Sequence, residues 1–321
     1  MILITGAAGF IGSCLVSRFN QLGRMDMILI DDFKNEDKRR NLLLKNYAGS
    51  TDRSLAFDFI NTHFLIIEAI IHIGARTDTT SKDVEIFDTL NLNYTKKLFT
   101  ICAERSIPII YASSAATYGN GEFGYTEIEE TLFKLQPLNP YAHSKHDFDK
   151  WALQQVKVPP SWVGFKFFNV YGPNEYHKKR MASVVFHAYN QIKKTGTCTL
   201  FKSHKNTYEN GEQLRDFVYV KDVVNVIVWA LLNKPKSGIY NLGTGKARSF
   251  NDLANALFAA LKLPSNISYI DTPADIRQSY QYYTQADMNK LTSAGFYDPF
   301  TSLENGVKDY VSNYLEPSIY L

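Results

Sequence analysis

The chain has 321 residues, of which 45% are hydrophobic and 21% are charged, and its formal net charge is +3. This composition is that of a globular protein with one large or two closely joined domains, and it gives no support for a nucleic acid partner. Cys14, Cys102 and Cys198 are scattered, which argues against a disulfide framework and favours a cytoplasmic protein. No apolar stretch is long enough to cross a bilayer, and a strand is predicted from residue 2, so we expect neither a membrane partner nor a leader.

The first apolar strand, residues 2–5, runs directly into Gly6, Gly9 and Gly12, and a helix is predicted over 10–22. Because glycine has no Cβ, backbone N–H groups in such a turn can approach a pyrophosphate, towards which the helix also points its positive end. A second strand, 27–30, ends at Asp31, and an acidic residue there usually takes ribose hydroxyls. The pattern predicts a dinucleotide site rather than an ordinary tight turn.

Further along the chain, short apolar runs alternate with helical patterns, which is typical of βαβ units. The expected strands are 54–57, 69–73, 108–112, 162–168, 217–220 and 239–243, and the expected helices are 85–105, 139–155, 182–194 and one opened by Asp222 that ends near 232. The sequence therefore predicts an α/β fold with a Rossmann doubly wound parallel sheet and a smaller mixed α/β C-terminal substrate domain. We expect the first domain to comprise 1–168 plus about 216–245, and the second about 169–215 plus 246–321.

Chemistry is indicated by Tyr141 and Lys145, which are four residues apart at the start of a predicted helix and therefore share one face. The ammonium should lower the pKa of the phenol, and such a phenol can exchange a proton with a substrate hydroxyl. Ser114 follows the strand 108–112, at the sheet edge where open α/β proteins bind ligands. The structural alternative for Tyr141 and Lys145 is a pair on a helix surface. For the turn at Ser114 it is a turn whose side chains form hydrogen bonds with its own backbone. The glycine turn favours catalysis over both.

Three of these segments, residues 5–12, 113–119 and 141–145, resemble the extended short-chain dehydrogenase/reductase superfamily. The segments 165–173, 177–178, 181–187, 214–220, 241–245 and 283–287 are similar to the family of ADP-L-glycero-D-manno-heptose 6-epimerases, which are nucleotide-sugar epimerases. The resemblance covers nearly the whole chain.

The resemblance implies a set of residues around a nicotinamide cofactor. Phe10 and Ile11 lie over its pyrophosphate, Asp58 closes the third strand beside the adenine, and Ala75 lines the nicotinamide side. The implied set is Gly6, Gly9, Phe10, Ile11, Gly12, Asp31, Asp32, Lys38, Asp58, Ala75, Asn91, Tyr141, Lys145, Val170 and Lys178.

The resemblance also implies residues that hold an ADP-sugar. They are Ser114, Asn169, Arg180, His187, Phe201, Lys202, Ser203, His204, Arg215 and Tyr280. The chain departs from the family pattern at Arg180, at 202–204 and in a longer 202–213 loop, and these departures concern fine substrate recognition. Four histidines (His63, His72, His143 and His146) show no metal-ligand spacing, and we expect no metal.

Lys178 matches the family's second acid/base. Inversion at a carbinol carbon requires oxidation and a return of hydride to the other face, so a proton donor or acceptor is useful on both sides. Tyr141 and Ser114 would serve one side and Lys178 the other. Two alternatives exist for residues 178–180: a basic segment that only faces solvent, or a segment that only binds the diphosphate.

The cofactor is expected to be NADP, with NAD as the alternative. Asp31 by itself favours NAD because a carboxylate repels a 2′-phosphate. Lys34, Lys38, Arg39 and Arg40 follow closely and could neutralise that phosphate, and the resembling family uses mainly NADP.

The expected activity is inversion of C6 in ADP-D-glycero-D-manno-heptose, a precursor of lipopolysaccharide, by a homo-oligomeric isomerase. A UDP-hexose 4-epimerase is the enzymatic alternative, and a non-catalytic nicotinamide-sensing protein is the alternative from another class. Ala115 and Ala116 argue against dehydration, because two alanines cannot exchange protons.

Overall fold

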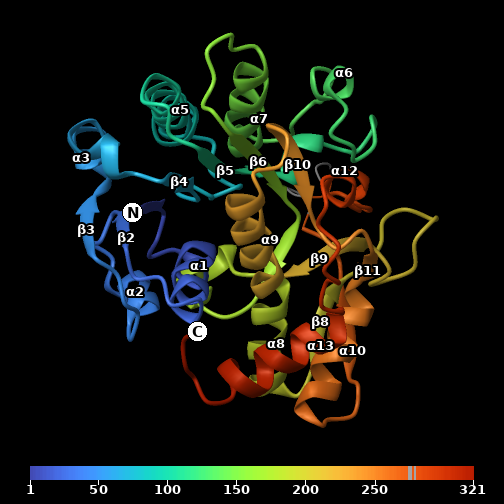
Figure 1. Ribbon diagram of the computed structural model, residues 1–321. Coiled ribbons are helices and arrows are strands. Elements are labelled where there is room, and N and C mark those ends of the chain that lie inside the picture. Colours follow the sequence, from blue (N-terminus) through green and yellow to red (C-terminus); the bar gives the residue numbers. More distant parts are fainter. Residues whose placement is uncertain (274–276, 278–279) are drawn as a thin grey trace.

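A parallel sheet of seven strands forms the centre of the computed structural model, which describes residues 1–273, 277 and 280–321 (Figure 1). Its strands, in spatial order, are β10 (Gly238–Leu242), β6 (Trp162–Phe167), β5 (Ile109–Ser114), β4 (Ala69–His72), β1 (Ile2–Thr5), β2 (Met27–Asp31) and β3 (Gly49–Asp52). The chain proceeds outward from β1 to β3 and then returns to the other side of β1, so the order reverses between β1 and β4. Such a reversal opens a crevice at the carboxyl ends of the strands, and the predicted doubly wound fold is confirmed.

Helices cover both faces of this sheet. Figure 1 shows α5 and α7 on one side and α1 and α9 on the other. The helices of this part are α1 (Phe10–Gln21), α2 (Glu36–Arg39), α3 (Ala56–His63), α4 (Val84–Phe87), α5 (Tyr94–Glu104), α6 (Glu129–Leu132), α7 (Pro140–Leu153) and α9 (Val220–Asn233). The helix predicted over 85–105 is continuous but includes a π-helical segment, Asp88–Asn93, between α4 and α5.

A smaller part, built largely from the second half of the chain, contains two short sheets. The first consists of β11 (Ala247–Ser249), β9 (Leu214–Tyr219) and β7 (Asn169–Tyr171), and the second of β12 (Ile267–Ile270) and β8 (Cys198–Phe201). Its helices are α8 (Val184–Thr195), α10 (Phe250–Leu261), α12 (Asn289–Ser293) and α13 (Leu303–Tyr310). Within the segment 216–245, β10 joins the large sheet whereas β9 pairs with β7 and β11. The division into two domains stays a prediction.

Two local predictions are wrong. The third strand is Gly49–Asp52 rather than 54–57, because the apolar run at Leu55 leads into α3, where Ala56 and Ile60 are buried one turn apart. The true strand lies at the sheet edge and is polar, so its sequence carries no hydrophobic signal. Asp222 does not cap α9, which begins at Val220; its carboxylate instead accepts hydrogen bonds from the N–H and hydroxyl of Thr301, at 2.8 and 2.9 Å.

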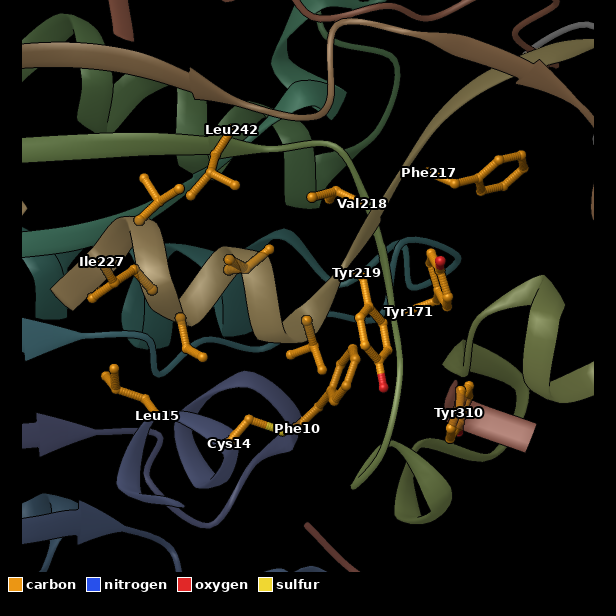
Figure 2. Packing of buried hydrophobic residues seen from close by; sticks show 14 of the residues in the cluster. Phe10, Cys14, Leu15, Tyr171, Phe217, Val218, Tyr219, Ile227, Leu242 and Tyr310 are labelled. Carbon is orange, nitrogen blue, oxygen red and sulfur yellow. The ribbon is translucent and has the colours of Figure 1, made fainter. Parts of the chain in front are cut away.

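The larger core cluster runs from the layer between α1, α9 and the sheet into the smaller part, where α8, α10 and α13 contribute to it. Figure 2 shows Leu15 of α1 and Ile227 of α9 in this layer, with Leu242 of β10 above them. Cys14, Cys102 and Cys198 are all buried and unoxidised. Over the described residues, no helix combines the length and the apolar character that a membrane span requires.

Replacing Ile227 by Ala should destabilise the fold by about 2–5 kcal/mol, because the side chain is fully buried and its removal leaves a cavity between α1 and α9. Ile227→Val, the matched control, removes one methyl group and should cost about 0.5–1.5 kcal/mol. Equilibrium urea unfolding measures both values. Equal stability of the Ala variant and the wild type would contradict this packing.

Candidate active site

A cleft with a volume of about 760 Å³ opens at the carboxyl ends of β1, β2 and β4. This volume is typical of small-molecule sites. Ten of the residues predicted for the cofactor or the substrate line it: Gly6, Gly9, Phe10, Ile11, Gly12, Asp31, Lys38, Ala75, Lys178 and Arg180. Its lining also includes residues that sequence reasoning missed, among them Asn35, Arg53, His72, Asp78, Leu90 and Tyr94.

The glycine turn forms one wall of the cleft and tolerates no side chain. Gly6 has a φ of +67°, and a Cβ added to it would lie 2.5 Å from the Cα of Gly74, just beyond β4. A Cβ on Gly12 would lie 2.2 Å from the Gly6 carbonyl oxygen. Gly9 precedes the first residue of α1, so the N-terminal N–H groups of this helix face the cleft, as an anion site requires.

Asp31 ends β2 and is almost completely buried. Its carboxylate accepts hydrogen bonds from the N–H groups of Ala8, at 2.9 Å, and of Asp32, at 2.7 Å, and it forms an ion pair with Lys38. These contacts join the end of β2 to the glycine turn and bring a cation to the same point. Asp32 does not line the cleft, and its carboxylate lies 3.6 Å from the guanidinium of Arg53.

Asp58 lies outside the cleft, contrary to its expected place beside the adenine. It is exposed in the first turn of α3, because the third strand ends at Asp52, five residues earlier than the sequence pattern indicated. The side chain that follows the true end of β3 is Arg53, which does line the cleft.

Asn91 is buried in the π-helical segment and does not line the cleft itself, but it contacts Arg76, which does. Its amide oxygen accepts from Arg76 N at 2.8 Å, and its amide nitrogen donates to Arg76 O and to the Ser144 hydroxyl, both at 3.0 Å. Ser144 in turn donates to the carbonyl of Tyr141 at 2.7 Å. Asn91 therefore connects the loop that lines the cleft to the helix that carries Tyr141, an arrangement typical of π-bulges at functional sites.

Tyr141, Lys145 and Ser114 gather at the adjoining end of β5 but are not part of the cleft lining itself. Lys145 is buried, and its ammonium donates to the carbonyl of Ala112 at 2.8 Å. Burial lowers the pKa of Lys145 to about 8, although the Asp149 carboxylate acts in the opposite direction.

The pKa of Tyr141 is raised, not lowered as the sequence suggested. Burial is the main cause, the Ser114 hydroxyl lowers the pKa as a hydrogen-bond partner, and the charge of Asp149 raises it. Loss of water around the phenol thus outweighs the hydrogen bond with Ser114, and no lowering by the Lys145 charge accompanies it.

A buried ion pair lies behind these residues. Lys166 and Asp149 are at most 1% exposed, and their charged atoms are 2.6 Å apart. Asp149 also accepts from Ser113 at 2.6 Å and Tyr111 at 3.1 Å, and Lys166 donates to Thr117 at 2.7 Å. The pair therefore joins α7, β5, β6 and the turn that follows Ser114.

Lys178 and Arg180 lie on a short turn, Tyr176–Met181, along the rim of the cleft. The Lys178 ammonium is 5.4 Å from the centre of the Phe10 ring, and burial lowers its pKa. Arg180, expected to bind substrate, has one guanidinium nitrogen 3.0 Å from both carboxylate oxygens of Asp78 on the opposite loop. His187 Nε2 lies 3.3 Å from the Arg180 carbonyl.

The remaining substrate candidates lie away from the cleft lining. Phe201, Arg215 and Tyr280 come together: the guanidinium is 5.5 Å from the Tyr280 ring centre, and the Tyr280 and Phe201 ring centres are 6.2 Å apart. Lys202 pairs with Asp271 at 3.3 Å, Ser203 N donates to Asn210, and His204 Nε2 accepts from Thr272 N. Asn169 is exposed at the start of β7, next to the half-buried Val170.

Within the described part of the chain, no three His, Cys, Asp or Glu side chains gather as a metal site would require.

Comparison with known proteins agrees with this geometry. Residues 2–243 match the model of the NAD dependent epimerase/dehydratase family. Two relatives named ADP-L-glycero-D-manno-heptose-6-epimerase, from Fusobacterium nucleatum and Nitratidesulfovibrio vulgaris, are 49% and 43% identical, each over 98% of both chains. The crystal structure of the Helicobacter pylori enzyme of that name is 31% identical, with a TM-score of 0.81 over 97% of this chain and 95% of that one. The resemblance inferred from the motifs is confirmed.

Breaking the buried ion pair should cost about 3–5 kcal/mol of stability, because either single change, Asp149→Asn or Lys166→Met, leaves the other group without its partner. The double variant should lose less than the sum of the two single losses, since it strands no charge. Denaturant unfolding of the four proteins gives the coupling. Additive losses would contradict the pairing.

Proposed function

We propose that this chain, which belongs to the NAD dependent epimerase/dehydratase family, converts ADP-D-glycero-D-manno-heptose to ADP-L-glycero-D-manno-heptose. The names of relatives that match the chain over 98% of its length support this choice of sugar and of carbon. The observation that carries the proposal is the position of Lys178, which lines the same cleft as the glycine turn and lies over Phe10. An ionisable group at this place is what a two-sided inversion needs in addition to Tyr141.

The residues of the cleft fit a nicotinamide dinucleotide. The glycine turn admits no side chain, so its backbone and the start of α1 are free to face a pyrophosphate. Asp31 stands where ribose hydroxyls are bound in this type of fold, and Ala75 lines the far end of the cleft beyond β4. The cofactor, when bound, supplies an acceptor and then a donor of hydride, so that the C6 carbinol becomes a ketone and is reduced from the opposite face.

The side chains supply the proton transfers that accompany these hydride transfers. When hydride leaves C6, the proton of its hydroxyl passes to one basic group; when hydride returns, an acidic group on the other side protonates the oxygen. We assign Tyr141, assisted by Ser114, to one side and Lys178 to the other. Lys145 holds positive charge near the phenol and would bind the nicotinamide ribose.

We infer that the cofactor is NADP. Lys38 pairs with Asp31 and so offsets the negative charge that would repel a 2′-phosphate. Asn35 and Arg53 line the same end of the cleft, whereas Arg39 and Arg40 line a separate hollow beside α2. The cations at Lys38 and Arg53 therefore support NADP over NAD.

We also propose a homo-oligomer, as the sequence resemblance implies, located in the cytoplasm, as the scattered cysteines indicate. The substrate-binding roles of Asn169, His187, Phe201, Arg215 and Tyr280 remain part of this proposal. Arg180 would have to leave Asp78 in order to contact the sugar nucleotide.

Lys178→Met should abolish inversion at C6 while the purified protein keeps its normal content of NADP, because the change removes a proton carrier and leaves the glycine turn, Asp31 and Lys38 to hold the nucleotide. Tyr141→Phe should have the same effect. Product NMR with a panel of ADP- and UDP-sugars measures turnover and identifies the carbon that is inverted. Lys194→Met, at an exposed site on α8, is the matched control. Normal turnover by Lys178→Met would refute the role of Lys178, and turnover of a UDP-hexose alone would favour a 4-epimerase.

Lys38→Ala should weaken NADP binding by about tenfold or more and NAD binding much less, because it removes a charged partner and exposes the charge of Asp31. Nucleotide affinities measured by calorimetry, and sensitivity of the released nucleotide to a 2′-phosphatase, provide the readout. Arg39→Ala, on the separate hollow, is the control. An equal loss for both nucleotides would argue against NADP selectivity.

A further inference from the structure

Glu175 is a carboxyl group buried at the start of the turn that carries Lys178. Its side chain has no exposed surface, which is rare for glutamate unless a partner compensates the lost water. The catalytic scheme above gives this residue no role.

Three hydrogen bonds hold the carboxylate. One oxygen accepts from the Ser183 hydroxyl at 2.7 Å and from Gly172 N at 3.3 Å, and the other accepts from Ser183 N. Ser183 is also the N-cap of α8, where its hydroxyl accepts from Phe186 N at 3.2 Å. Glu175 therefore closes the segment 172–183 on itself and fixes both of its ends against the positive end of a helix.

Lys178 lies in the middle of the segment that Glu175 closes. Its N–H donates to the Glu175 carbonyl at 2.9 Å, and the next residue, Lys179, has a φ of +51°, which is uncommon for a residue with a side chain. A conformation of this kind persists only where surrounding contacts determine it. The contacts of the Glu175 side chain join the two ends of this turn, at Gly172 and Ser183.

Charge also couples the two residues. Burial raises the pKa of Glu175, whereas the hydrogen bonds from Ser183 and the charge of Lys178 lower it. For Lys178, burial lowers the pKa and the charge of Glu175 raises it.

Two cations, Lys45 and Lys221, act on Cys14 of α1 together with Glu175 and so also lie near the pair. Four further titratable groups around it are neutral near pH 7. Burial raises the pKa values of Cys14 on α1, Tyr176 on the turn and Tyr310 on α13, and it lowers the pKa of His177 to about 4. Glu175 is the group whose charge acts on the pKa of Lys178 in this poorly hydrated place.

We propose that Glu175 is the positioning residue of Lys178: its carboxylate fixes the turn that presents the amine to the cleft and supplies the negative charge that this amine faces. The inference rests on the acid/base role proposed for Lys178. It requires no contact between Glu175 and substrate or cofactor.

The test compares Glu175→Gln, which removes the charge at nearly constant shape, with Ser183→Ala, which removes the two hydrogen bonds of the Ser183 hydroxyl and keeps the charge. Trace acetylation of the holoenzyme over a range of pH, read by mass spectrometry, gives the titration midpoint of Lys178, with exposed Lys262 as internal standard. In Glu175→Gln we expect the Lys178 midpoint to fall by about one pH unit, because the amine loses its opposite charge. The Ser183→Ala midpoint should equal that of the wild type.

Turnover supplies the second readout. Glu175→Gln should lower kcat by about tenfold to a hundredfold with little change in KM, since the amine is misplaced but the binding groups are not. One limb of the kcat–pH profile should move to lower pH together with the acetylation midpoint. An unchanged midpoint and an unchanged profile would overturn the proposal, as would equal midpoint shifts in Glu175→Gln and Ser183→Ala.

Two further variants separate the possible failures. Should Glu175→Gln not fold, as a thermal melt would reveal, Glu175→Asp keeps the charge but is too short to span the turn; it should lose kcat and keep KM, and wild-type kcat would overturn the proposal. Active Lys178→Met would refute the proposed function and this inference together. Inactive Lys178→Met beside fully active Glu175→Gln would refute this inference alone.

Discussion

The close approach of the glycine turn to the chain beyond β4 is the constraint on which the rest of the site depends. A single Cβ on Gly6 would overlap Gly74, and one on Gly12 would overlap the backbone of the turn itself. Only without these atoms can β1, α1 and β4 converge at one point. That convergence leaves a cleft at the reversal of strand order, to which Asp31, Lys38 and Lys178 add charge.

Charged groups withdrawn from water surround this cleft, and each is compensated by specific partners. Lys145 is bonded to a β5 carbonyl, Asp149 and Lys166 pair beneath it, and Glu175 faces Lys178. Such an arrangement is costly to assemble, but it fixes donors and cations before a substrate arrives, which is how preorganised sites stabilise developing charge. Burial raises the pKa of Tyr141, which is the accompanying effect of withdrawing the phenol from water.

Features encoded by short-range patterns could be predicted from the sequence, and features that depend on distant packing could not. The glycine turn, Asp31 and the Tyr141–Lys145 pair each follow from a spacing within one strand–turn–helix unit or one helix. The polar edge strand at 49–52 carries no apolar pattern, so its position, and with it Asp58 and Arg53, was misjudged. The partner of Arg180 is Asp78, more than a hundred residues away, and the burial of Glu175 depends on α8 and α13, so neither could be read from local sequence.

The central claim is that one carbon is oxidised and reduced again within the cleft, with protons handled from two sides. The most direct measurement uses substrate carrying deuterium at C6 in ordinary water, with the isotope content of the product read by NMR. The account predicts that the inverted product retains deuterium at C6, because the hydride leaves and returns without exchange. Replacement of that deuterium by solvent hydrogen would contradict the account and indicate deprotonation at carbon.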